Sequence, residues 1–220
     1  MSTTSTTFRT FADIVDRLGG VPLDRIRARP FPATVQDVID IQDHEDRSCE
    51  LIDGVLVDKT VGFNESRMTC YLVGLLSQYV VSNNLGVVTG VDGPMQIMPD
   101  HVRIPDGAFT SWDRFPERMR TIDPVPELVP DLAVEVLSPA NTQDEMCLKR
   151  QDYFAAGVLL VWEIDIQKRT VDVYSPDGSV VTLTSAETLD GGEALPGFSL
   201  PLATYFAELD RHGKRTDSHS

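Results

Sequence analysis

The chain lacks the segments that would direct it to a membrane or out of the cell. Its longest apolar runs, such as VLLVW at 158–162, are far shorter than the about 20 residues that span a bilayer. Residues 1–20 contain no basic flank followed by an apolar core, so we expect no secretory signal. Three scattered cysteines without a CxxC pair indicate reduced thiols. We therefore expect a cytoplasmic protein.

Several ligand-binding signatures are also missing. The sequence has no glycine-rich nucleotide-binding loop of the GxGxxG or P-loop type. Its four histidines show no ligand spacing, which argues against a histidine-based zinc site.

Basic residues are scarce. The chain has 19 Lys and Arg against 34 Asp and Glu, a net charge of −15, which opposes non-specific binding to a polyanion through overall charge. A local basic patch or a metal-bridged phosphate stays possible. The candidate patch is a group of arginines in one stretch: Arg103, Arg114, Arg118 and Arg120.

The pattern of apolar residues predicts four helices and a series of strands. The helices are expected over 8–18, 34–46, 64–82 and 142–157, the second and fourth opening with capping boxes. Residues 49–60 form a hairpin around Asp53-Gly54. Three strands are expected at 86–99, 103–112 and 131–138, with a surface loop at 113–130, and two or three further strands are expected at 158–183.

This order of elements indicates a mixed α/β fold in which helices pack on a central sheet. At 220 residues the chain is long enough for one sizeable core. We expect an N-terminal extension with a short helix at 1–33, a main domain at 34–206 and a polar tail at 207–220.

One glutamate stands inside an apolar strand. In LAVEVL the residues Leu132, Val134 and Val136 share one face, and Glu135 shares the other with apolar neighbours. Both faces are thus expected to be buried, and a buried carboxylate needs compensation.

Asp106, in RIPDGAF one strand earlier, is a second acid among apolar neighbours. If the two strands are adjacent, Asp106 and Glu135 present paired hard oxygen ligands, which suit Mg²⁺ (or Mn²⁺). Lys149, in the following helix, is placed to lean back toward the strand ends and assist a metal-bound hydroxide.

These segments resemble the Uma-two family of restriction-endonuclease-like proteins, in the PD-(D/E)XK nuclease superfamily. The matching motifs are CELIDGVLV at 49–57, IPD at 104–106, PDLAVEVLSP at 130–139, the pattern from Lys149 to Trp162, and LPGFSLPL at 195–202. The resemblance covers roughly 34–206. It implies an αβββαβ core, preceded here by N-terminal helices and a hairpin. It also implies metal-dependent phosphodiester hydrolysis, with Asp106 and Glu135 as metal ligands and Glu50 as an additional acid.

The sequence departs from the superfamily pattern at one position. Where a lysine usually follows the strand glutamate by two residues, this chain has Leu137, so the role passes to Lys149. Glu65, at the start of the helix over 64–82, competes with Glu50 for the role of the extra acid, and Glu50 is slightly favoured.

We therefore expect a Mg²⁺- or Mn²⁺-dependent endonuclease that acts on nucleic acid, with DNA the favoured substrate. The arginines between 103 and 120 would supply its basic surface. The alternative is a catalytically idle module of the same fold that serves binding or assembly, as a homodimer for example.

Overall fold

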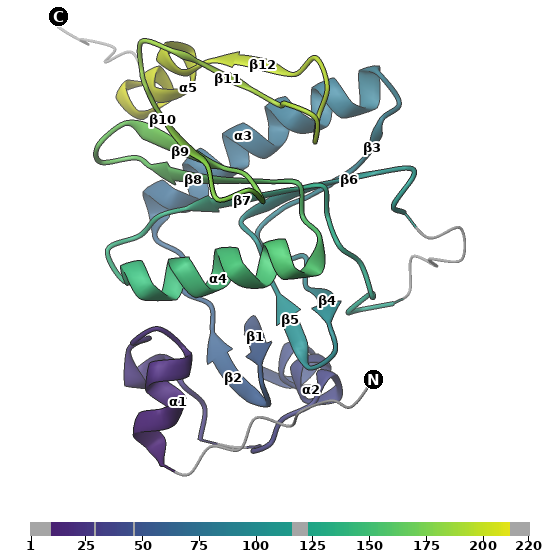
Figure 1. Cartoon of the computed structure of the whole chain (residues 1–220), viewed down its shortest axis with the longest axis vertical. Helices are drawn as coiled ribbons and strands as arrows, with labels where there is room; N and C mark the ends of the chain where they lie inside the picture. The colour runs from purple at the N-terminus through teal and green to yellow at the C-terminus, as the bar shows by residue number, and fades with distance from the viewer. Residues whose placement is uncertain (1–9, 29, 46, 116–122, 212–220) are drawn as a thin grey trace, which may run out of the picture.

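The structure is a computed structural model that describes residues 10–28, 30–45, 47–115 and 123–211. Its elements stack in layers (Figure 1). Within the described ranges, none of the helices combines the length and apolar character that a bilayer crossing requires. The helices are α1 (Phe11–Arg17), η1 (Leu23–Arg25), α2 (Val35–Glu45), α3 (Phe63–Ser82), α4 (Gln143–Ala156), α5 (Leu202–Ala207) and η2 (Glu208–Asp210).

The main sheet has six strands in the order β10-β9-β8-β7-β6-β3. Strands β7 and β8 are parallel and every other neighbouring pair is antiparallel. The α3–β3–β6–β7–α4–β8 succession gives the expected αβββαβ core. The strands are β3 (Gly86–Thr89), β6 (Gly107–Ser111), β7 (Leu132–Val136), β8 (Leu160–Asp165), β9 (Thr170–Tyr174) and β10 (Val180–Thr184).

A second, smaller sheet lies beyond α4 (Figure 1). Its four antiparallel strands have the order β2-β1-β5-β4. The hairpin β1–β2 turns at Asp53 and Gly54, which both have positive φ, as a type I′ turn requires. The strands are β1 (Cys49–Ile52), β2 (Val55–Asp58), β4 (Met95–Met98) and β5 (His101–Arg103).

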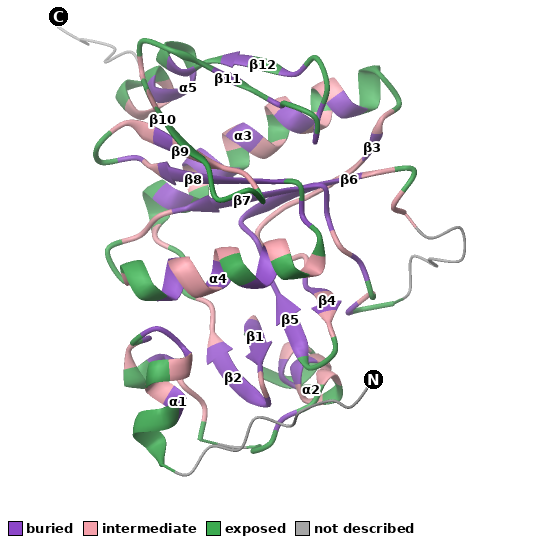
Figure 2. Ribbon diagram, in the orientation of Figure 1, coloured by how far each residue is buried: buried purple, intermediate pink, exposed green. Residues whose placement is uncertain are grey.

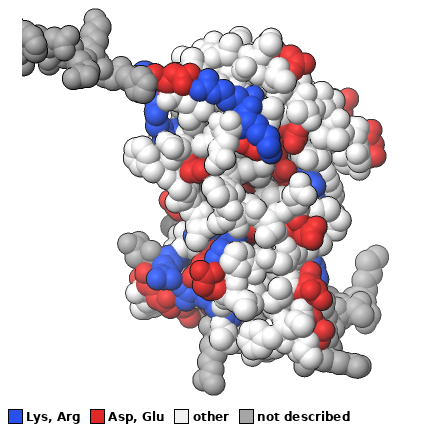
Figure 3. All heavy atoms as spheres, turned by 90° about the vertical axis from the view of Figure 1, so that its left-hand side faces the viewer, with Lys and Arg blue, Asp and Glu red and all other residues white. Residues whose placement is uncertain are grey.

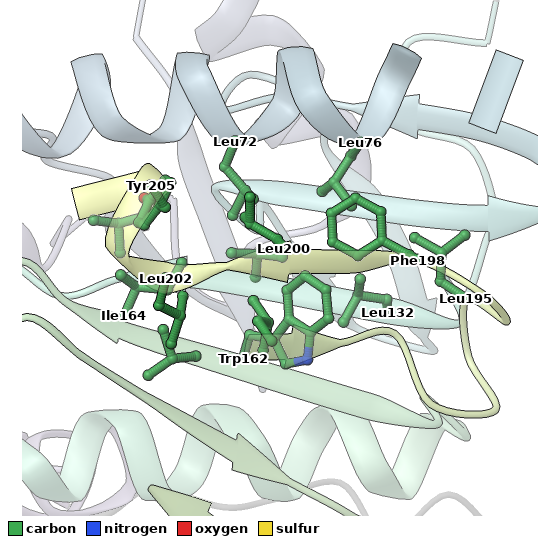
Figure 4. Close-up of a cluster of buried hydrophobic side chains, with 14 of the residues drawn as sticks. Leu72, Leu76, Leu132, Trp162, Ile164, Leu195, Phe198, Leu200, Leu202 and Tyr205 are labelled. Carbon is green, nitrogen blue, oxygen red and sulfur yellow. The ribbon is translucent and has the colours of Figure 1, made fainter. Parts of the chain in front are cut away.

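Helices cover both faces of the main sheet. Helix α3 packs on one face, where Leu72 and Leu76 meet Leu132 and Trp162 (Figure 4). The pair β11 (Thr188–Asp190) and β12 (Ser199–Pro201), with α5, completes this layer. Helix α4 covers the opposite face. The central strands β6, β7 and β8 are almost wholly buried, whereas β10 at the edge is exposed (Figure 2).

The helix and hairpin predictions are confirmed, and so is the capping box at Thr142–Glu145. At Thr34–Asp37 only half of the box forms: the Asp37 carboxylate accepts the Thr34 N–H, but the Asp37 N–H donates to the Thr34 carbonyl and not to its hydroxyl. Gly157, with φ 101°, ends α4 as expected. The strand predictions for 86–99 and 103–112 are wrong in one respect, because each stretch divides between the two sheets. Pro105 has no N–H to donate to a ladder, so β5 ends before it and β6 begins after it.

The N-terminal residues pack against the rest of the chain. Leu18 and Val21 share an apolar cluster with Val55 and Val57 of β2. The boundaries 1–33 and 207–220 stay predictions. Phe8 and most of the polar tail lie outside the described residues.

Trp162 is fully buried in the core beneath α3, whereas Trp112 is 47% exposed. Replacing Trp162 with alanine leaves a large cavity, so we expect a loss of about 3–5 kcal/mol in the free energy of unfolding. Trp112→Ala, the matched control, should lose much less. Urea unfolding followed by circular dichroism measures both, and equal losses would contradict this packing of the core.

Candidate active site

Glu135 lies on the face of β7 that α4 covers. Leu132, Val134 and Val136 point into the apolar cluster under α3, so the alternation of the strand turns Glu135 toward α4. The residue is 5% exposed. The strand pattern predicted that β7 is buried on both faces, and this prediction is confirmed.

Two side chains of α4 compensate the buried carboxylate. Lys149 Nζ lies 2.9 Å from Glu135 Oε1, and the Tyr153 hydroxyl, one turn further on, donates to the same oxygen at 2.6 Å. Burial raises the pKa of Glu135 to about 7; Lys149 opposes this increase and Asp106 adds to it. Glu135 is thus poised to exchange a proton near neutral pH.

Asp106 lies beside Glu135 at the start of β6. Its N–H donates to the carbonyl of Val134 at 2.9 Å, and its Oδ2 accepts the N–H of Val136 at 2.7 Å. Its other oxygen, Oδ1, lies 2.8 Å from Lys59 Nζ. Sequence reasoning missed Lys59, whose only signal is a charge directly after the apolar strand β2.

Glu50, on β1, has both carboxylate oxygens occupied. Oε1 lies 3.0 Å from Lys149 Nζ and accepts the N–H of Ile104 at 3.0 Å, while Oε2 lies 2.7 Å from Arg103. Burial alone would raise the pKa of Glu50, but Lys149 and Arg103 outweigh it and hold this pKa well below its usual range. Arg103 also pairs with Asp152 of α4.

Lys149 therefore bridges two acids from two sheets. Burial would lower its pKa, but Glu135 and Glu50 raise it above the ordinary value, so the ammonium stays charged. The expectation that Lys149 leans back toward the strand ends agrees with this geometry.

Glu65 differs from the other acids of the site. It lies in the first turn of α3, where the helix dipole favours a negative charge, and it is 8% exposed. Among the described residues its carboxylate has no hydrogen-bond or ion-pair partner. Glu65 nevertheless lines the same cavity as Glu50, Asp106 and Glu135.

The cavity that these residues enclose measures about 30 Å³, enough for one or two water molecules or an ion and too little for a nucleotide. Five carboxylates and three basic groups line it, so with all of them charged the wall carries two excess negative charges. The acids are Glu50, Glu65, Asp106, Glu135 and Glu145, and the bases are Arg25, Lys59 and Lys149.

This wall fits a divalent cation by charge and by donor type. Mg²⁺ is commonly held by one or two carboxylates together with water and substrate phosphate, so Asp106 and Glu135 suffice in number. No group of three or more His, Cys, Asp or Glu arranged to hold a metal occurs in the part of the chain that the structure describes. Any ion here would depend on fewer protein ligands.

The expected basic stripe is not formed by the two described arginines. Arg103 is 3% exposed and committed to Glu50 and Asp152, and Arg114 pairs with Asp131 at 2.8 Å. Arg118 and Arg120 lie outside the described residues. On the face shown in Figure 3, Lys and Arg gather in an upper and a lower group, each beside acidic side chains.

A larger groove of about 700 Å³ adjoins the cavity along the N-terminal half of α4, and Ser138 and Asn141 line both. Within this groove Arg150 lies 4.2 Å above the ring centre of Tyr174 and 2.5 Å from Glu163.

A mixed sheet between α3 and α4, with acids and lysine gathered at β6 and β7, defines a protein of the restriction-endonuclease-like fold. The profile of the Uma2 family, described as "Putative restriction endonuclease", matches residues 35–203. The chain therefore belongs to the Uma2 family, and the resemblance seen in the sequence is confirmed.

A solved structure shares the fold. It is the crystal structure of "a putative nuclease belonging to DUF820" from Anabaena variabilis ATCC 29413, which is 20% identical with a TM-score of 0.67. The match covers 74% of this chain and 92% of that one. No curated protein matches the chain.

The raised pKa of Glu135 predicts a pH dependence of stability. The folded chain holds this proton up to about pH 7, whereas the ordinary value is 4.5. The stabilisation is therefore complete below pH 4.5 and lost as the pH rises through 7. Glu135→Gln has no such proton, so its free energy of unfolding should decline less over this window. Urea unfolding at a series of pH values tests this, and parallel curves for the two proteins would contradict it.

Proposed function

We propose that this chain is a metal-dependent endonuclease that hydrolyses phosphodiester bonds in nucleic acid, with DNA as substrate and Mg²⁺ or Mn²⁺ as cofactor. One observation carries the proposal: Asp106, directly before β6, and Glu135, on the neighbouring strand β7, line a single small cavity whose wall has two excess negative charges when Glu135 is ionised. Such a wall is costly to bury unless a cation balances it.

Asp106 and Glu135 would hold the ion. A bound divalent cation lowers the pKa of a water molecule and polarises the scissile phosphate. Glu135 must release its proton to act as a ligand, so we expect its contribution to metal affinity to grow as the pH rises toward 7.

Lys149 is the proposed catalytic lysine in place of the one missing at Leu137. An ammonium has three N–H donors, and within the described chain Lys149 uses two of them, on Glu50 and Glu135. One donor is left for an attacking hydroxide or a phosphate oxygen. The two acids fix the ammonium so that this remaining N–H keeps one orientation.

The two candidates for the extra acid have different roles in this proposal. Glu50 has both oxygens engaged by Lys149, Arg103 and the Ile104 N–H, which suits a residue that positions Lys149. Glu65 has no partner in the described residues and lines the cavity, which suits a further acid that reaches the metal ion through water. We therefore now favour Glu65 for that role.

The substrate would approach from the larger groove, because the cavity itself is too small for a nucleotide. A nucleic-acid strand in this groove would reach the cavity between Ser138 and Asn141, which line both. Arg150 on Tyr174 offers a planar cation there for a base or a phosphate.

The alternative, an idle module for binding or assembly, also has an observation in its favour. Lys59 and Lys149 already pair with Asp106 and Glu135, so much of the buried charge is balanced without a metal ion. Divalent cation binding separates the two proposals, because an idle module has no need of it.

The decisive test is cleavage of plasmid and single-stranded DNA with Mg²⁺ and with Mn²⁺. We expect Glu135→Gln to lower the cleavage rate about a hundredfold or more. Even residues that only hydrogen-bond to a metal ligand change activity or metal affinity by about 10–100-fold when they are mutated. Glu208→Gln is the control: Glu208 is a half-buried glutamate that pairs with Arg67 and Arg211 and lines neither the cavity nor the groove. Activity that is equal in wild type and Glu135→Gln would overturn the assignment.

A further inference from the structure

Lys59 is a lysine with little exposure at the cavity wall, to which the proposed function gives no role. It follows β2 directly, and its side chain is 9% exposed. It lines the same cavity as Glu65, Asp106 and Glu135.

The ammonium of Lys59 has three acceptors. Asp106 Oδ1 lies 2.8 Å away, the carbonyl oxygen of Ile104 2.7 Å and that of Val91 3.3 Å. Because an ammonium has three N–H donors, these contacts use all of them. Lys59 therefore has no donor left for a phosphate, in contrast to Lys149, which keeps one.

The acceptors also fix where the positive charge stands. Two of them are backbone carbonyls, of Val91 between β3 and β4 and of Ile104 between β5 and β6, so the ammonium cannot move toward a substrate without losing both. The two backbone carbonyls therefore hold the Lys59 ammonium in one position, in contact with Asp106 Oδ1.

We propose that Lys59 is a positioning residue that restricts the site to one divalent cation by standing where a second would be needed. With Glu135 ionised, as a metal ligand must be, the wall has two excess negative charges while Lys59 is in place, and one divalent ion balances them. Without Lys59 the excess becomes three, and Asp106 Oδ1 is released for a further ion. This inference rests on the proposed metal-dependent function and adds the number of ions and the residue that sets it.

The consequence is unusual for a lysine beside a metal site, because removing it should strengthen metal binding. A merely structural lysine gives the opposite result, since its loss loosens Asp106 and weakens binding. The sign of the change therefore distinguishes the two roles.

The test is calorimetric titration with Mn²⁺ of the whole chain, without nucleic acid. Lys59→Met removes the charge at similar length. Lys59→Gln is the second variant, because its amide keeps an N–H donor for the Ile104 carbonyl and favours native folding. The control is Lys168→Met, which removes an exposed lysine that lies 2.7 Å from Asp165. Circular dichroism and thermal unfolding establish that each variant is folded.

We expect wild type and Lys168→Met to bind about one Mn²⁺ per chain with the same affinity. A folded Lys59 variant should bind the first ion at least about tenfold more tightly, because the Lys59 ammonium and a cation on Asp106 repel each other strongly in a site of low dielectric constant. It should also take up a second ion.

Unchanged or weaker Mn²⁺ binding in a folded Lys59 variant, beside a wild type that binds one ion, overturns this inference alone and leaves the proposed nuclease intact. Two ions in the wild type overturn it as well. Failure of the wild type and of both Lys59 variants to bind Mn²⁺ overturns the inference and the metal-dependent function together. Binding only in the Lys59 variants overturns both as well, because the natural chain would then hold no ion where the inference requires one.

Discussion

The arrangement of this protein depends on how it buries negative charge between its main sheet and α4. Glu50, Asp106, Glu135 and Asp152 lie there with little or no contact with water. An isolated buried carboxylate is prohibitively costly, so each must meet a cation or a proton. Arg103, Lys59 and Lys149 supply the cations, and the pKa of about 7 at Glu135 indicates that a proton is the remaining compensation.

The chain places these charges by passing between the two sheets at Pro105. Strand β5 brings Arg103 to Glu50 in the small sheet, and two residues after Pro105 the chain joins the main sheet as β6. Asp106 therefore lies at the junction of the sheets, beside Glu135 on β7. Helix α4 closes the junction with Lys149, which contacts an acid from each sheet.

Local patterns predicted the elements, most of the acids that line the cavity and Lys149, but they missed Lys59 and misplaced Arg103. An acid within the apolar strand LAVEVL identifies Glu135 because a period of two assigns it a buried face. Asp106 was identified as an acid among apolar neighbours and Lys149 by its place in the following helix. The family resemblance supported both. Lys59 and Arg103 were missed or misplaced because a basic residue looks the same in sequence whether it is solvated or buried. The strand pairing of the small sheet decides whether Lys59 and Arg103 are solvated or buried. That pairing was not predicted, because each of two predicted strands divides between the two sheets.

The central claim is that Asp106 and Glu135 hold one divalent cation in the cavity beside Lys59 and Lys149. Crystals of the wild-type chain soaked in Mn²⁺, measured for anomalous diffraction at the manganese edge, test it most directly. The account predicts a single anomalous peak in this cavity, in contact with both carboxylates. A cavity without a peak at saturating Mn²⁺, or a peak that touches neither residue, would contradict the account.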